Sequence, residues 1–218
     1  MAIYLKEFEN HTQYENYING SGAILPNVSI CTTEGDVHYN PYVDPYNGHE
    51  YVDLGLPSGT KWATMNIGAS SETDYGNYYQ YGKGAAQYAA TSGDSDYSGT
   101  EIPLALSADT AAQVWGGSWH MPTRAQMEEL KTNTTYEWTT INGVNGGKFT
   151  AENGNYVFFP AASYCENGSQ NPVGNNGYCW SSTSTDRTSA YRLSVYRTGK
   201  NVGPDFRRLG YSVRGVVG

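Results

Sequence analysis

The residues that could do covalent or metal chemistry are few and scattered along this sequence. Three cysteines, Cys31, Cys165 and Cys179, are an odd number and lack the spacing of a metal site. Glu128 and Glu129 are neighbours on an expected helix and point apart, so they do not form a glycosidase pair. The sequence contains no Ser-His-Asp order with a nucleophile elbow. The histidines are equally scattered, at positions His11, His38, His49 and His120. These patterns indicate no enzyme, no cofactor and no metal site.

The C-terminal stretch "SVYRTGKNVGPDFRRLGYSVRGVVG" carries residues suited to noncovalent recognition. Phe206 and Leu209 stand beside Asp205, Arg207 and Arg208 in a segment expected to be a loop, where small polar residues are usual. Aromatic and arginine side chains are enriched at binding hot spots. We therefore expect Phe206 and Leu209 to be exposed apolar anchors. The alternative is that they pack under the loop as a small satellite core.

The strand before this loop is expected to have two different faces. In Tyr191–Tyr196 the odd-numbered residues are Tyr, Leu and Val, and the even-numbered residues are Arg, Ser and Tyr. Successive side chains of a strand point to opposite faces. If the odd-numbered residues fill the core, the even-numbered ones are free to contact a ligand.

Composition narrows the class of protein. The chain has 218 residues, of which 38% are hydrophobic and 16% charged, with 26 glycines and 20 tyrosines, which is typical of short strands and turns. The net charge of −8 makes nucleic acid a poor default partner. No segment has the length and hydrophobicity of a membrane span.

The first residues, "MAIYLKEFENH", lack the basic-then-apolar order of a secretory signal. The protein stays inside the cell, has lost a leader, or leaves by a route that needs no signal. A disulfide between Cys165 and Cys179 is left open, but free thiols are favoured for a chain made in a reducing compartment.

Residue composition and pattern change near His49, which divides the chain into residues 1–48 and residues 49–218. In the first part, Tyr4–Ile18 has helical spacing, and a strand, a turn at Glu34–Asp36 and a return strand follow. This part is too small to build much of a core, so we expect an attachment or oligomerisation module.

The second part reads as many short strands separated by Gly/Asn turns, with one clear helix within Asp109–Asn133. Pro122 suits the first turn of that helix, Thr123 its N-cap, and Met127 and Leu130 its buried side. Mostly strand with a helix makes an α+β domain.

Seven segments of the second part carry a family resemblance. In order they are "DLGLPSGTKWATMNIGA", "YGNYYQYGKG", "GGSWHMPTRAQMEEL", "NGGKFTAENGNYVFFPAASY", "GYCWSSTS", "AYRLSVY" and "GYSVRGV". Together they resemble the major paralogous domain of some anaerobic bacteria and the C-type-lectin-fold variable proteins of diversity-generating retroelements in gut bacteria and phages. The resemblance implies a C-type lectin fold of the branch that includes formylglycine-generating enzymes. The first 48 residues resemble, over a shorter stretch, a module of phage structural proteins.

The resemblance also implies which C-terminal positions form a framework and which are displayed to a ligand. The framework positions would be Trp180, Ser181, Ser182, Ala190, Tyr191, Leu193, Val202, Gly210, Tyr211, Ser212, Val213 and Arg214. The displayed, ligand-binding positions would be Asp186, Arg187, Ser189, Arg192, Ser194, Tyr196, Arg197, Gly203, Asp205, Phe206, Arg208 and Leu209.

Two other activities known on this fold find little support in the residues. Formylglycine-generating enzymes need two closely spaced reactive cysteines, whereas Cys165 and Cys179 lie in unlike contexts and suit buried structural thiols. Calcium-dependent sugar-binding lectins carry Glu-Pro-Asn or Gln-Pro-Asp followed by Trp-Asn-Asp, and the Trp-Asn-Asp motif is absent here.

The expected function is that of a receptor-binding or accessory virion protein without enzymatic activity. Its C-terminal surface would bind a bacterial surface protein or polysaccharide, and its N-terminal module would contact other virion proteins or form a homo-oligomer. It would reside in the virion, in a tail or head appendage. A cell-surface or secreted bacterial adhesin of the same fold is the alternative, and an oxidase is a third hypothesis.

Overall fold

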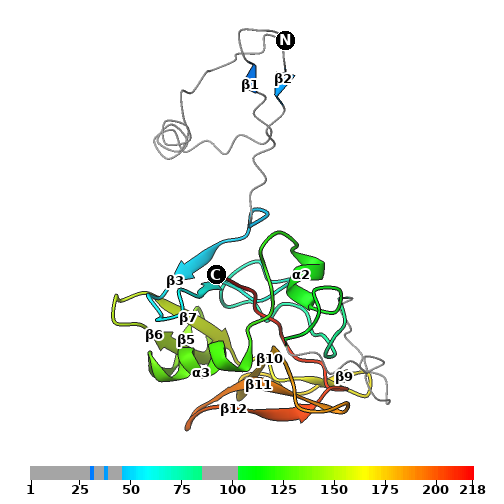
Figure 1. Ribbon diagram of the computed structural model, residues 1–218. Helices are drawn as coiled ribbons and strands as arrows, with labels where there is room; N and C mark the ends of the chain where they lie inside the picture. Colours follow the sequence, from blue (N-terminus) through cyan, green and yellow to red (C-terminus); the bar gives the residue numbers. More distant parts are fainter. Residues whose placement is uncertain (1–29, 32–36, 39–45, 85–102) are drawn as a thin grey trace, which may run out of the picture. The chain divides into compact units, whose positions relative to one another are not determined.

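The computed structural model describes residues 30–31, 37–38, 46–84 and 103–218 (Figure 1). The chain divides into two units, Met1–Asp44 and Pro45–Gly218. In the first unit, β1 (Ile30–Cys31) pairs antiparallel with β2 (Val37–His38), which fits the expected strand and return strand. The turn expected at Glu34–Asp36 lies outside the described residues. The helix expected at Tyr4–Ile18 lies outside the described residues.

The second unit is built mainly from small antiparallel sheets. Three of them have three strands, in the orders β13-β4-β3, β5-β6-β7 and β10-β11-β12, and β8 pairs with β9. Together with two helices in the described residues, this confirms the α+β class. The bounds are β3 Tyr51–Asp53, β4 Lys61–Ala63, α2 Thr110–Val114, α3 Arg124–Thr132, β5 Thr135–Ile141, β6 Val144–Thr150, β7 Tyr156–Pro160, β8 Cys165–Glu166, β9 Ser169–Gln170, β10 Asn176–Ser184, β11 Ser189–Tyr196, β12 Gly199–Phe206 and β13 Val216–Val217.

The helical region contains two helices where the sequence predicts one. Gly116 and Gly117 follow α2 with positive φ angles of 66° and 59°, a backbone conformation that ends a helix. Thr123 is the N-cap of α3, as predicted, and it forms a capping box with Gln126. Met127 and Leu130 are fully buried, also as predicted, whereas Pro122 precedes the cap and lies outside the first turn.

The segment expected to be a long C-terminal loop is largely a strand. β12 runs from Gly199 to Phe206 and pairs with β11 along its whole length, so only Arg197 and Thr198 connect the two strands. After this hairpin the chain forms only the short strand β13, and before it Tyr211 and Ser212 form isolated bridges with Tyr79 and Cys179. The final segment therefore contacts Tyr79 and strand β10 before it pairs with β4.

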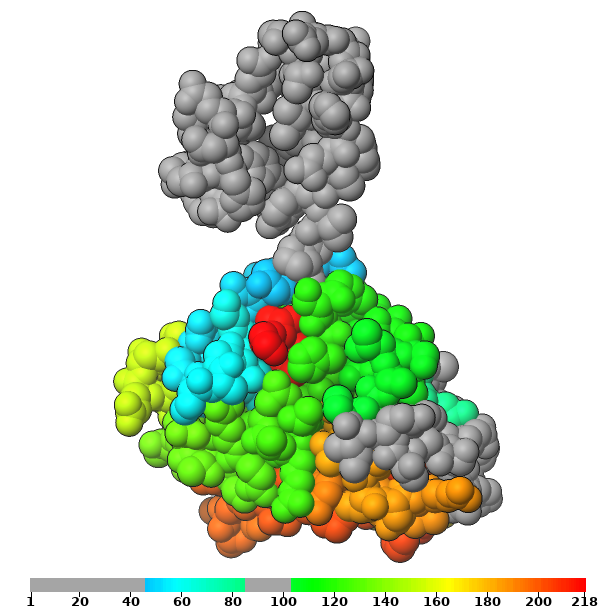
Figure 2. Space-filling model, viewed as in Figure 1, coloured from blue at the N-terminus to red at the C-terminus, as the bar shows by residue number. Residues whose placement is uncertain are grey.

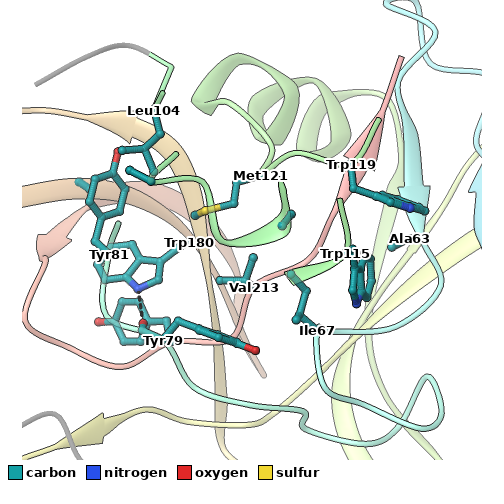
Figure 3. Packing of buried hydrophobic residues seen from close by; sticks show 14 of the residues in the cluster. Ala63, Ile67, Tyr79, Tyr81, Leu104, Trp115, Trp119, Met121, Trp180 and Val213 are labelled. Atoms are coloured by element: carbon teal, nitrogen blue, oxygen red, sulfur yellow. Dashed lines mark hydrogen bonds between the residues drawn. The ribbon is translucent and has the colours of Figure 1, made fainter. Parts of the chain in front are cut away.

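Aromatic side chains fill one of the main cores of the second unit (Figure 3). Trp180 stands beside Tyr81 and Tyr79, and its indole Nε1 donates a hydrogen bond to the Tyr79 carbonyl oxygen at 2.9 Å. Trp115 and Trp119 pack edge to face, with ring centroids 5.0 Å apart, at the other end of the cluster. The C-terminal strands are thus anchored on large, fully buried rings.

Buried Arg214 connects the C-terminal segment to the segment that follows β4 and to strand β7. Its Nε and Nη2 donate to Asn66 Oδ1 at 3.0 and 2.8 Å, and its guanidinium lies over the Phe159 ring. Burial lowers the pKa of Arg214 to about 10, which still leaves it charged at neutral pH. Of the twelve framework positions, all are buried except Tyr191, which is half-buried.

A candidate binding surface on the β10–β12 sheet

The two faces of β11 differ as the alternating sequence predicts. Leu193 and Val195 are buried in a core shared with Cys179 and Val202, and Tyr191 packs against the same core. Helix α3 packs on this sheet, as Figure 1 shows. The opposite face carries Arg192 and its neighbours. Residues of β11 and β12, orange to red in Figure 2, reach the surface of the unit.

Arg192 is fixed by a network that spans two strands and the segment after them. Its Nε lies 3.2 Å from Asp205 Oδ2, with 15% and 24% of the two side chains exposed. The hydroxyl of Tyr211 donates to the same carboxylate oxygen at 2.8 Å. Burial, and next the charge of Asp205, raise the pKa of Tyr211, so this hydroxyl stays protonated and remains a donor. The guanidinium is therefore pre-ordered and still partly accessible.

Ser194 and Gly203 lie between the Arg192 side chain and the sheet backbone. Arg192 Nη1 donates to Ser194 Oγ at 3.1 Å, and Ser194 Oγ donates to the Asn201 carbonyl oxygen at 3.2 Å. Ser194 is only 4% exposed, so the expectation that it is displayed is wrong: the arginine covers it. Gly203 is the register partner of Arg192 on β12 and is also buried, so the expectation that it is displayed is wrong as well.

Tyrosine rings extend the surface beyond Arg192. Tyr178 of β10 stacks on Tyr211 with ring centroids 4.9 Å apart, and Tyr164 meets Tyr178 edge to face at 5.9 Å. The Arg192 guanidinium lies 5.3 Å from the centroid of the Tyr178 ring. Tyr164 and Tyr178 were not among the expected site residues, because the signal that places them here is tertiary rather than local.

Phe206 and Arg208 form the apolar and cationic end of this surface. Phe206 is 51% exposed, and the Arg208 guanidinium lies 4.4 Å from the centroid of its ring. Arg208 Nη2 lies 3.3 Å from Glu166 Oε1. Glu166 is brought there because Cys165 and Gly210 exchange two backbone hydrogen bonds. An exposed aromatic ring beside a half-exposed arginine fits the expected anchor.

Leu209 is not an exposed anchor. It is only 7% exposed and belongs to the aromatic core with Trp180 and Tyr211. A tight turn explains this position, because the Leu209 amide donates to the Phe206 carbonyl oxygen at 3.1 Å and the chain reverses there. The alternative of packing under the loop therefore holds for Leu209 and fails for Phe206.

The remaining expected residues lie toward the two ends of the β11–β12 hairpin. Asp186 and Arg187 are exposed in the β10–β11 turn, and Ser189 is half-buried at the start of β11. The Asp186 carboxylate organises this turn by accepting backbone hydrogen bonds, first from Thr188. These hydrogen bonds lower the pKa of Asp186. Tyr196 is half-buried and Arg197 is exposed at the other end.

The binding surface is defined hereafter by seven residues. Four of them are expected positions, which the structure holds as two pairs in succession along β12 and the turn after it: Arg192 with Asp205, and Phe206 with Arg208. The full set is Tyr164, Glu166, Tyr178, Arg192, Asp205, Phe206 and Arg208.

The two described thiols are free and buried. Burial raises the pKa of Cys165 and raises that of Cys179 to about 12. A thiolate is the reactive form of cysteine, so this environment disfavours thiol chemistry at neutral pH. Within the described ranges, no three His, Cys, Asp or Glu side chains are grouped to hold a metal ion.

Comparisons with protein-family models, with curated proteins and with solved structures found no match. In the part of the chain that the structure describes, neither helix has the length and hydrophobicity needed to cross a bilayer.

Proposed function

We propose that this chain is a noncovalent receptor-binding protein, whose binding surface contacts a bacterial surface protein or polysaccharide. The single observation that carries the proposal is the exposed Phe206 ring against the Arg208 guanidinium, which follow the ordered Arg192–Asp205 pair along β12 and the turn after it. Aromatic and charged side chains are thus concentrated at this end of the sheet, as they are at protein interfaces.

Rigidity of the surface supports the same function. Arg192 is held by Asp205, Ser194 and the Tyr178 ring, so little side-chain entropy is lost when a ligand binds. The exposed part of the Arg192–Asp205 ion pair can exchange bound water for polar groups of a ligand. Modest affinity at each copy suffices if several copies act together on one particle.

Within the α+β class, the proposal also names a particular fold and a particular role for the chain. We assign the second unit to the C-type lectin fold and the chain to a virion appendage, with the first unit as the attachment or oligomerisation module. The C-type lectin fold rests on the seven ordered segments, and the virion role on the resemblance of the first 48 residues. The buried framework positions and the alternating faces of β11 are compatible with both.

The proposal is tested by measuring how variants of the purified protein attach to a panel of whole anaerobic gut bacteria. We expect Phe206→Ala with Arg208→Ala to reduce attachment to the bound strain by at least about tenfold, as loss of hot-spot residues does. Lys131→Ala, which removes a partly exposed cation of α3, serves as the control and should bind normally.

Equal attachment by the double variant and the parent protein would reject the binding surface. Both side chains reach the surface, so the double variant is expected to keep the parent's circular dichroism spectrum. That spectrum separates a loss of binding from a loss of folding.

A further inference from the structure

Strand β5 has one edge without a partner strand. It is the outermost strand of the β5-β6-β7 sheet, and in the part of the chain that the structure describes it pairs with β6 alone. None of its seven residues is buried, so the strand lies at the surface of the second unit. An open edge presents unpaired backbone N–H and C=O groups, to which another strand can bind.

The hairpin turn decides which backbone groups of β5 face this open edge. The β5–β6 hairpin has a two-residue turn, so Ile141 and Val144, the residues on either side of it, form a hydrogen-bonded pair. Along an antiparallel pair of strands, hydrogen-bonded and non-hydrogen-bonded residues alternate. The N–H and C=O groups of Tyr136, Trp138 and Thr140 therefore point away from β6 and toward the open edge.

β5 has none of the features that usually protect an exposed edge. Its sequence "TYEWTTI" contains no proline, glycine or lysine, and its register with β6 is unbroken. β12, the edge strand of the β10-β11-β12 sheet, contains all three residue types. By the same alternation, the N–H that Pro204 lacks would have pointed to the open edge of β12. The edge of β5 is thus suited to pairing with another strand, whereas the edge of β12 is not.

A second copy of β5 matches this edge in one antiparallel register. When Trp138 faces Trp138 of the second copy, Tyr136 faces Thr140, and every outward N–H and C=O group of these residues has a partner. In this register Glu137, the one charged residue of β5, faces Thr139 of the second copy. The next registers that match the outward groups either oppose the two Glu137 carboxylates or leave Tyr136 unpaired. Like charges placed directly opposite each other disfavour strand pairing.

We propose that two copies of this chain pair through their β5 strands, antiparallel and centred on Trp138. The two three-stranded sheets then form one continuous sheet about a two-fold axis, in the order β7-β6-β5-β5-β6-β7. The two Trp138 side chains stand opposite each other on one face, as a cross-strand aromatic pair. Both open edges are used in this contact, so assembly through them stops at the dimer. The inference does not rest on the proposed receptor-binding function, since the binding surface includes no residue of β5.

Sedimentation equilibrium of the full chain tests this pairing. We expect the average mass to rise from 23.9 kDa toward twice that value between about 1 and 500 µM protein, because a small strand-edge interface gives a weak dimer. Thr140→Pro removes an outward N–H and leaves the hydrogen bonds to β6 in place, so the dissociation constant should increase at least about tenfold. Thr140→Ala is the matched control, since it loses the same side-chain contact with Asn145 but keeps the N–H. It should dimerise like the parent protein.

Two further variants test the register through side chains alone. Thr139→Glu places a carboxylate opposite Glu137 of the second copy and should increase the dissociation constant at least about fivefold. Glu137→Thr combined with Thr139→Glu exchanges the two residues, keeps the net charge of the parent protein and restores a Glu–Thr pair. This exchange variant should dimerise like the parent. Near-ultraviolet circular dichroism verifies folding, and the Thr139 variants decide the question if Thr140→Pro does not fold.

Three results would overturn the proposal. They are a mass of 23.9 kDa at every concentration, equal dissociation constants for the folded Thr140→Pro and Thr140→Ala variants, and equal dissociation constants for Thr139→Glu and the exchange variant. An edge that takes a strand only from a different protein would give the first result. Self-association through the first unit alone would give the second and the third. Attachment to bacteria through the binding surface is measured separately and can fail or succeed independently.

Discussion

Arg192 illustrates how a single residue can be both displayed and structural. It contacts Tyr178 on β10, Ser194 on its own strand and Asp205 on β12. Removing one partner from a partly buried ion pair leaves an uncompensated charge, so the pair also stabilises the hairpin. A ligand would meet a guanidinium whose direction is already set.

Individual residues also show where local sequence reasoning stops. The faces of Leu193 and Val195 were predictable, because a strand alternates with a period of two. Phe206 and Leu209 look alike in the sequence, yet only Phe206 is exposed. Their difference arises from the turn between them and from the space beside Trp180, and neither is visible in residue type or spacing.

The buried thiols yield a prediction about reactivity. In the Cys31→Ser variant, which leaves Cys165 and Cys179, folded protein should resist iodoacetamide at a pH of about 8. With its pKa raised to about 12, Cys179 is a thiolate in only about one molecule in ten thousand at that pH. Mass spectrometry should find no adduct on folded protein and two adducts after unfolding in urea.

Rapid modification of Cys179 in the folded protein would contradict this environment. It would also revive the hypothesis of an oxidase, which requires accessible, reactive thiols.

At the scale of elements, glycines decide how closely the sheets approach. The hairpin of β5 and β6 was readable from its Asn142-Gly143 turn, where both φ angles are positive, at 47° and 81°. Gly116 and Gly117 also indicated a break between α2 and α3, but the residues on both sides have helical spacing and favoured a single helix. The pairing of β12 could not be predicted, because its Gly, Pro and Asn residues are poor strand formers.

Gly147 on β6 gives a prediction at this scale. A Cβ there would lie 2.7 Å from Tyr136 Cε2 and 2.8 Å from Val195 Cβ, closer than packed atoms allow. Gly147→Ala should therefore force β6 away from β11 and lower the free energy of unfolding by about 1–3 kcal/mol. Urea unfolding followed by tryptophan fluorescence measures the change.

Gly203→Ala is the matched control for Gly147→Ala. Its new methyl group would meet the mobile end of Asn201 at 3.0 Å, so we expect little change in stability. If the two variants unfold at the same urea concentration as the parent protein, close contact between β6 and β11 is not a determinant of stability.

The whole molecule divides into two units, and the second has cores of its own. We expect the fragment Pro45–Gly218 to unfold in one cooperative transition, at the same midpoint as that unit in the full chain. Thermal unfolding monitored by near-ultraviolet circular dichroism compares the two proteins. A fragment that lacks a cooperative transition would show that the first unit is required for folding.

By contrast, deleting residues 216–218 from the same fragment should prevent it from folding. Val216 and Val217 are buried and pair with Trp62 and Lys61 of β4. Burial of two valines contributes about 3–6 kcal/mol, which is comparable to the whole stability of many domains, about 5–15 kcal/mol. The near-ultraviolet signal should be lost.

The sheet β13-β4-β3 has a further consequence for the order of the chain. β3 and β13 flank β4 on its two sides, so the first and last strands of the second unit are parallel and separated by a single strand, about 10 Å. Because the two strands are parallel, Val217 lies level with Asp53 at the end of β3, so a glycine-rich linker must cross this spacing and also run back along β3 to make the unit circular. New ends could then be opened at the exposed Asn142-Gly143 turn, giving a permuted protein with the same packing.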